Sequence, residues 1–161
     1  MLRGSLPTVL LLSLTATSAF AQGNKNVVGT WRLVSYEVEA QATGQRGPIM
    51  GEKPTGYATF LPEGRVFFVL TGEGRKPAST DQERAALLGT VIAYTGTYTL
   101  DGDKWTTDVE VAWNPEWIGT KQVRTFEIKD DRLMVTTPWR VMPNFPDKGT
   151  SRSIVTFERV K

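Results

Sequence analysis

Two carboxylates and one arginine are the side chains of this sequence whose spacing best suits chemistry. Asp108 and Glu110 are two residues apart in a segment with the residue types of a β-strand. Because every second side chain of a strand points to the same side, the two carboxylates share one face. If the connection that follows is symmetric about Trp117, Glu110 lies directly opposite Arg124 on the next strand. A carboxylate there could transfer protons while Arg124 or Tyr94 stabilises a developing negative charge. Such a group would serve a cofactor-independent isomerase or cyclase.

The face on which Arg124 lies decides whether this chemistry is possible. The alternation places Glu110 and Arg124 on the outer face, where an exposed ion pair contributes only about 0 to 1 kcal/mol. This argument favours a surface position. Phe126 and Val135 share that face, however, which is unusual for an exterior. A bulge near residues 114–120 would reverse the alternation and bring Arg124 inside, where it would hold a carboxylate or an enolate oxygen.

Aromatic rings occupy the other face of the same two segments. Centring the hairpin between Asp101 and Gly102 pairs Tyr98 with Trp105. The rings that share this face, which we expect to point inward, are Tyr94, Tyr98, Trp105 and Trp113. Gly96 would leave space beside them. A ligand would stack on Tyr94 or Trp113, or the rings would simply fill the interior, as they do in most small barrels.

Trp117 lies in a loop between Pro115 and Gly119 and has two interpretations. As an exposed aromatic ring at the rim of the interior it would guide an apolar ligand inward. Alternatively, it folds back over the open end. The same two interpretations apply to three side chains of a later proline-rich loop, Trp139, Met142 and Phe145.

Several kinds of site are excluded by what the sequence lacks. It contains no histidine and no cysteine, so it has no imidazole base, no thiolate nucleophile and no nitrogen or sulfur ligand for zinc or haem. The aspartates of 101–103 and 130–131 lack the order of a calcium loop. No phosphate-binding loop, dinucleotide fingerprint or G-x-S-x-G elbow occurs. We therefore expect no metal and no cofactor.

The first 21 residues have the pattern of a secretory signal peptide. They carry a single cation, Arg3, then an apolar stretch over 6–14, and small residues at Ala19 and Ala21. We expect cleavage before Gln22 and an exported protein, periplasmic or secreted. No later segment has the ~20 apolar residues of a membrane span.

The remaining residues, 22–161, fit one domain. The chain has 19 basic and 17 acidic side chains, of which only Arg3 lies in the expected signal. This near balance, with no cluster of lysine and arginine, argues against a nucleic-acid partner. It leaves the oligomeric state open.

Short strands joined by turns account for most of this domain. The expected strands cover 27–38, 56–61, 65–70, 92–100, 104–113, 121–128, 133–137 and 151–160. Eight antiparallel strands suit an all-β, up-and-down barrel, because closure removes exposed sheet edges. Thr80-Asp81-Gln82-Glu83 has the form of a capping box and predicts one short helix ending at Gly89, a possible lid.

Gly29-Thr30-Trp31 on the first expected strand resembles the G-x-W signature of the lipocalins and the wider calycin group. The stretches 94–98 (YTGTY), 114–120 (NPEWIGT) and 122–124 (QVR) resemble the lipocalin-like domain proteins of bacteria and fungi. The resemblance implies an eight-stranded barrel with an internal cavity for a hydrophobic ligand. It also implies that Trp31 forms the barrel floor under an arginine of the last strand, Arg159 in preference to Arg152.

The sequence therefore predicts an exported lipocalin-like barrel that binds a small, largely apolar molecule. The expected ligand-binding residues are Tyr94, Glu110, Trp113, Trp117 and Arg124. Nothing in the sequence requires catalysis, and the alternative isomerase or cyclase depends on Asp108, Glu110 and Arg124 facing the cavity. A third possibility is an interaction module whose barrel is packed solid by its aromatic rings.

Overall fold

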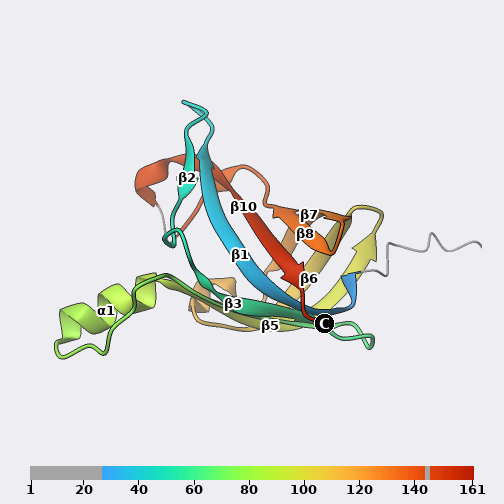
Figure 1. Ribbon diagram of the computed structural model, residues 1–161, viewed down its shortest axis with the longest axis horizontal. Helices are drawn as coiled ribbons and strands as arrows, with labels where there is room; N and C mark the ends of the chain where they lie inside the picture. Colours follow the sequence, from blue (N-terminus) through green and yellow to red (C-terminus); the bar gives the residue numbers. More distant parts are fainter. Residues whose placement is uncertain (1–26, 144–145) are drawn as a thin grey trace, which may run out of the picture.

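Eight antiparallel strands close into a barrel in the computed structural model, which describes residues 27–143 and 146–161 (Figure 1). The barrel strands are β1 (Gly29–Ala40), β3 (Thr55–Phe60), β4 (Arg65–Thr71), β5 (Val91–Asp101), β6 (Lys104–Ala112), β7 (Lys121–Lys129), β8 (Arg132–Thr136) and β10 (Thr150–Arg159). β1 pairs with both β3 and β10, and this pairing closes the sheet. The predicted all-β barrel is confirmed. The predicted signal segment, 1–21, lies outside the described residues.

Two further strands were not predicted. β2 (Arg46–Pro48) pairs with the end of β1, and β9 (Arg140–Val141) pairs with the beginning of β10. Both are too short to show a period-two alternation of apolar side chains, so the sequence carries no signal for them. They extend one end of the barrel beyond its eight main strands.

The two ends of the barrel are built differently. At the end where β1 begins and β10 ends, which we call the floor, three short turns join neighbouring strands. At the opposite end, the mouth, all four longer connections gather, covering 41–54, 72–90, 113–120 and 137–149. A ligand would have to pass these connections to reach the interior.

Trp31 closes the floor. Its ring is fully buried, and its Nε1 donates a hydrogen bond of 2.7 Å to the carbonyl oxygen of Val27. The Arg159 guanidinium lies over the ring, with its Cζ 4.0 Å from the centroid, as the resemblance implied. Gly29 makes room for this contact, because a Cβ there would lie 3.1 Å from Arg159 Nη1. The G-x-W pattern is thus explained by the packing of a cation on the floor tryptophan.

The hairpin of β5 and β6 is shifted from the predicted register. Asp101 pairs with Lys104, so Gly102 and Asp103 form the turn, and Tyr98 pairs with Thr107 in place of Trp105. Gly102 has φ +57°, which glycine adopts without a Cβ clash. Because the shift is two residues, the inward face is unchanged from Gly96 to Val109. Val111, expected on the same face, is 61% exposed.

A bulge follows on the same hairpin, between the Thr95–Val111 and Gly96–Val109 pairs. Gly96 was expected to leave room beside the rings, and this was wrong. The backbone of β6 occupies that space, since a Cβ on Gly96 would lie 1.9 Å from the carbonyl oxygen of Asp108. Glycine at this position allows two strands to approach closely.

Aromatic rings pack the half of the barrel nearer the floor. Phe60 lies at the centre, in edge-to-face contact with Phe68, Tyr98 and Trp105 at centroid distances of 5.0 to 5.8 Å. Trp105 also contacts Phe126 at 5.3 Å. This half of the interior is therefore filled, and any ligand must bind nearer the mouth.

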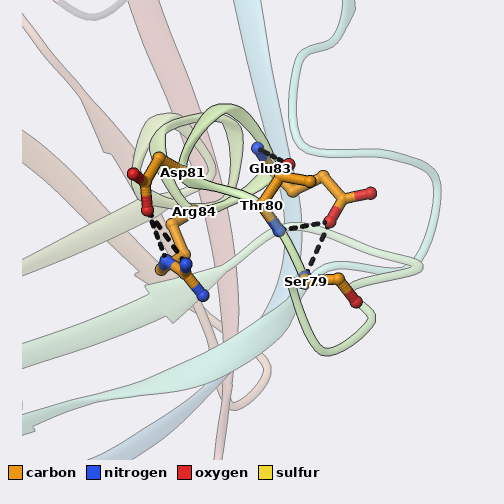
Figure 2. A network of polar contacts seen from close by, with 5 residues as sticks. All are labelled: Ser79, Thr80, Asp81, Glu83 and Arg84. Carbon is orange, nitrogen blue, oxygen red and sulfur yellow. Dashed lines mark hydrogen bonds and ion pairs between the residues drawn. The ribbon is translucent and has the colours of Figure 1, made fainter.

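The predicted helix is present as α1 (Asp81–Gly89). Figure 2 shows its capping box, in which Glu83 N donates to Thr80 Oγ1 while the Glu83 carboxylate accepts from the backbone of Ser79 and Thr80. Arg84 adds a contact with Asp81. Figure 1 shows α1 projecting away from the strands, and none of its residues is buried. It does not cover the barrel.

Candidate ligand-binding site

A small cavity lies inside the barrel, toward the mouth. Its volume is about 40 Å³, which is space for a few water molecules. Most of its wall is apolar, and the side chains that form this part include Phe68, Leu70, Ile92, Val135, Val155 and Phe157. The polar part of the wall comes from Tyr36, Tyr94, Arg124, Thr137 and Arg140. The cavity thus combines an apolar surface with two cations.

Arg124 points into the barrel from β7. It pairs across the sheet with Trp105, and only 6% of its surface is exposed. Its Nη2 donates to Gln122 Oε1 at 2.8 Å and its Nη1 to the carbonyl oxygen of Val123 at 2.8 Å. The surface position that the sequence favoured is wrong. Asp108 pairs with Lys121, so the register of β6 and β7 differs from the symmetric one that was assumed.

Arg140 reaches the same place from β9. Its Nη1 donates to Gln122 Oε1 at 3.1 Å, so one amide oxygen accepts from both arginines. Its Cζ lies 5.8 Å from the centroid of the Trp117 ring. Burial lowers the pKa of Arg140 from its ordinary value, and the charge of Arg124 lowers it further. The shift is the expected result of placing two cations together away from water.

No carboxylate balances these charges. Among the described residues, no Asp or Glu oxygen lies within 4.0 Å of a nitrogen of Arg124 or Arg140, although the other ion pairs of the barrel are formed on its exterior. The tyrosines do not replace one. Burial raises the pKa of Tyr36 and Tyr94 above 10.0, more than the neighbouring arginines lower it. Both phenols are neutral at physiological pH.

The structure leaves several buried polar atoms of the described residues without a hydrogen-bond partner, and two of them belong to residues that line the cavity, Trp105 and Arg140. Within the described part of the chain these atoms are Trp105 Nε1, Thr107 Oγ1, Trp113 Nε1 and Arg140 Nε. Trp105 pairs with Arg124 across the sheet, and Thr107 pairs with Gln122. Buried polar groups are normally satisfied, so such atoms indicate a missing partner. Three of the four atoms are N–H donors, which need an acceptor.

Trp117 covers the cavity from the mouth. It lies on a short 3-10 helix, η2 (Pro115–Trp117), and is 6% exposed. Its ring contacts Tyr94 at 5.5 Å and Trp113 at 6.2 Å, edge to face in both cases. Of the two interpretations of Trp117, the ring folded over the open end is the one present. Trp113 lies behind it and does not line the cavity.

A family model for the lipocalin-like domain matches residues 28–160, which is most of the chain. The chain belongs to the lipocalin-like domain family. The resemblance noted in the sequence is thereby confirmed. No curated protein sequence matches it significantly. Among solved structures, a redesigned beta barrel is similar at 15% identity and a TM-score of 0.44, covering 89% of this chain and 100% of that one.

The carboxylates that the sequence singled out lie outside this lipocalin-like barrel. Glu110 forms a two-point ion pair with Arg65 on β4, with its Oε2 2.8 Å from Arg65 Nη1. Asp108 forms an ion pair with Lys121. Both carboxylates are about half exposed, with 45% of each side chain accessible. These outward positions are the ones that the alternation of the sequence favoured, whereas the isomerase or cyclase alternative and a ligand contact by Glu110 require them to face the cavity, which they do not.

Of the predicted ligand-binding residues, the lipocalin-like barrel brings Tyr94, Trp117 and Arg124 together at its cavity. The sequence reasoning missed Arg140 and Tyr36, and it did not use Gln122. Tyr36 could not be found from the alternation of Trp31 and Leu33, because a bulge between Leu33 and Ser35 shifts the register of β1 and brings Tyr36 inward. Arg140 gives no sequence signal either, since its strand has two residues. In the loop around it, Met142 is buried and Trp139 lies partly exposed beneath Arg152, while Phe145 is outside the described residues.

Within the described residues, no helix is long and apolar enough to cross a membrane. No group of three or more acidic side chains within them could hold a metal ion. The cavity below Trp117 brings apolar, tyrosine and arginine side chains together inside the barrel.

Proposed function

We propose that this lipocalin-like barrel binds a small, largely apolar molecule in the cavity below Trp117. The observation that carries the proposal is the wall of this cavity, which is apolar over most of its area although it sits beside unsatisfied polar groups. A closed barrel needs no such combination for stability, because buried polar atoms without partners destabilise the fold. A ligand would supply the missing contacts.

The size of the cavity limits the ligand and its route of entry. Sites that enclose drug-sized molecules have volumes of ~300–1,000 Å³, much larger than the present 40 Å³. The aromatic rings packed below the cavity leave no room for it to grow toward the floor. The cavity can grow toward the mouth, because Trp117 and Arg140 lie on short elements outside the eight barrel strands. Binding therefore involves an outward displacement of the Trp117 ring.

Export is the second part of the proposal and rests on the pattern of residues 1–21. A protein that binds its ligand outside the cytoplasm would start with such a segment. The test is the mass of the protein recovered from its own host, in the culture medium, in the envelope fraction and in the cytoplasm. A form beginning at Gln22 in either of the first two fractions supports export, and a full-length cytoplasmic form contradicts it.

Catalysis by Asp108 and Glu110 is not part of the proposal. Their carboxylates lie on the outside of the barrel in ion pairs, so they cannot exchange protons with a molecule in the cavity. The interaction module without a cavity is not favoured either, because the rings of Phe68, Tyr94 and Trp117 leave a cavity between them, which they line.

Binding can be tested with native mass spectrometry and with saturation-transfer NMR. Protein purified from its host is first examined for a bound small molecule. The protein is then titrated with small probes, both neutral (toluene and 1-hexanol) and acidic (hexanoate). Saturation transfer to at least one probe is expected.

A matched pair of variants shows whether the probe enters the barrel. Val135→Phe fills the cavity, because Val135 lines it, whereas Val123→Phe adds the same ring on the outer face. Only the first substitution should abolish saturation transfer, with thermal melting used to check that both variants fold. If no probe binds and no molecule accompanies the purified protein, the proposal is wrong. Equal binding by both variants would also contradict it.

A further inference from the structure

We propose that the ligand carries a carboxylate, and that the guanidinium groups of Arg124 and Arg140 hold it inside the barrel. The inference rests on the proposed function and names the chemical class of the ligand. It follows from the charges, the free donors and the apolar wall of the same cavity.

The first argument is charge. Arg124 is 6% exposed, and Arg140 shares its acceptor with it. Buried charges in proteins are normally paired, because an unpaired charge loses its hydration without compensation. No carboxylate of the described residues pairs with either arginine, and both neighbouring tyrosines are neutral. A neutral ligand would remove the remaining water and leave the two cations uncompensated. An anion would compensate both.

The second argument is the count of donors. Two guanidinium groups carry ten N–H donors. Among the described residues, their hydrogen bonds go to the carbonyl oxygen of Val123 and twice to Gln122 Oε1, and Arg124 also contacts the Tyr94 hydroxyl. Most of the ten donors remain for a ligand. Arg140 Nε and Trp105 Nε1 are buried without a partner, and both residues line the cavity. An ionised carboxylate only accepts hydrogen bonds, and its two oxygens match the planar fork of an arginine.

The third argument separates an organic acid from an inorganic anion. Phosphate or sulfate would satisfy the donors, but it would leave the apolar wall of Leu70, Ile92 and Val155 in contact with a hydrated ion. A carboxylate attached to a short apolar group would bind the arginines through its oxygens and the apolar wall through its carbon atoms. The ligand class is therefore a small aliphatic or aromatic carboxylic acid in its ionised form.

The test compares matched acids and alcohols by isothermal titration calorimetry at neutral pH. The pairs are hexanoate with 1-hexanol and phenylacetate with 2-phenylethanol, and inorganic phosphate is titrated alone. We expect each acid to bind at least about tenfold more tightly than its alcohol, because an ionised carboxylate accepts charge-assisted hydrogen bonds from the guanidinium groups and a hydroxyl does not. Phosphate alone should bind more weakly than either acid.

Variants assign the preference to the two arginines. Arg124→Met and, separately, Arg140→Gln should reduce the acid-to-alcohol ratio to below about threefold while alcohol binding stays measurable. Arg65→Met removes an arginine from the outer face and is the control, with an unchanged ratio expected. Circular dichroism and thermal melting show that each variant is folded. If Arg124→Met does not fold, the partly buried Arg140 gives the same test with Arg140→Gln.

The possible results distinguish the two proposals. If acid and alcohol bind equally, or if both arginine variants keep the wild-type ratio, the carboxylate inference is wrong and the proposed function stands. If phosphate binds as tightly as the acids, the site is for inorganic anions and the inference is also wrong. If neither acids nor alcohols bind, both proposals fail.

Discussion

Arg124 and Arg140 donate hydrogen bonds to one and the same atom, Gln122 Oε1, at 2.8 and 3.1 Å. The two residues come from strands that do not pair with each other, since β7 pairs with β6 and β8 and β9 pairs only with β10. Two like charges therefore lie close together inside the barrel, because both guanidinium groups donate to the side chain of Gln122. In the absence of a bound anion, their proximity opposes folding.

Replacing Arg124 by methionine should stabilise the empty protein. The variant removes a buried charge while keeping an extended side chain, and we expect the free energy of unfolding to rise by about 1 to 2 kcal/mol. Urea denaturation without added anions measures this. Arg65→Met, which breaks the exposed pair with Glu110, should lower the free energy by less than about 1 kcal/mol. A loss of stability in Arg124→Met would show that the arginine serves the fold and not a ligand.

Gly96→Ala should destabilise the barrel by about 3 kcal/mol or more, because the new Cβ would lie 1.9 Å from the carbonyl oxygen of Asp108 and the strands would have to separate. Gly47→Ala is the matched control. Nothing lies within 4 Å of a Cβ at that position, so its effect should be within about 0.5 kcal/mol. Chemical denaturation of both variants decides the point, and equal effects would contradict the close approach of β5 and β6.

The floor can be tested with two arginines that each lie over a tryptophan. Arg159 covers the buried Trp31 at 4.0 Å, and Arg152 covers the partly exposed Trp139 at 4.5 Å. A cation over an aromatic ring contributes about 2 kcal/mol when desolvated and about 0.5 to 1 kcal/mol when exposed. We expect thermal denaturation to show a larger loss for Arg159→Met than for Arg152→Met. A larger loss for Arg152→Met would contradict the view that the contact of Arg159 with Trp31 closes the floor of the barrel.

Stability should fall as the pH rises above 10. Burial raises the pKa of Tyr94 above its ordinary value of 10.0, so the unfolded chain loses the phenolic proton first. The contribution of Tyr94 to stability is complete below pH 10 and disappears as the pH rises through its folded pKa. Tyr94→Phe should therefore show a shallower decline between pH 9 and 11 than the wild-type protein. Tyr57→Phe, at a ring that is 52% exposed, should decline like the wild type.

Thr80→Ala should loosen α1 without loosening the barrel. The Thr80 hydroxyl accepts the hydrogen bond from Glu83 N, and loss of an N-cap destabilises a helix by about 1 kcal/mol. Since no residue of α1 is buried, the effect should stay local. Hydrogen exchange of the amides of 84–89 should become faster, with the exchange of β5 unchanged. An equal change in both segments would mean that α1 and the barrel unfold together.

Strand positions were predictable because the barrel buries alternate residues along β5 to β8. The length and path of the eight-residue connection from β6 to β7 (113–120) were not, since they depend on how η2 folds. A loop assumed to be symmetric about Trp117 placed Glu110 opposite Arg124, whereas β7 in fact starts beside Asp108. The apolar residues of the pairs Phe126–Val135 and Ile128–Leu133 already indicated which face of β7 and β8 points inward. Apolar pairs on one face indicate the interior, and Arg124 shares that face.

The other parts of the site could not be predicted from the alternation of apolar and polar residues. Arg140 belongs to a strand of two residues. Its position depends on the pairing of this strand with β10, where Arg140 lies opposite Ser151. The Gly102–Asp103 turn was misplaced because either of two neighbouring dipeptides supplies the glycine that a hairpin turn requires. Local residue preferences leave this choice open, and the cross-strand packing of Trp105 with Arg124 settles it.

Within the described residues, the strand that carries Arg140 pairs with the barrel at two positions, Val141 with Thr150 and Arg140 with Ser151. One of the two cations of the site can therefore be exchanged without disturbing any of the eight strands. A lipocalin-like barrel built in this way can change the charge of the molecule it accepts by altering a single short loop. For protein engineering, residues 138–141 are the place to redirect the specificity of this scaffold, while Met142 beside them belongs to the core and is kept.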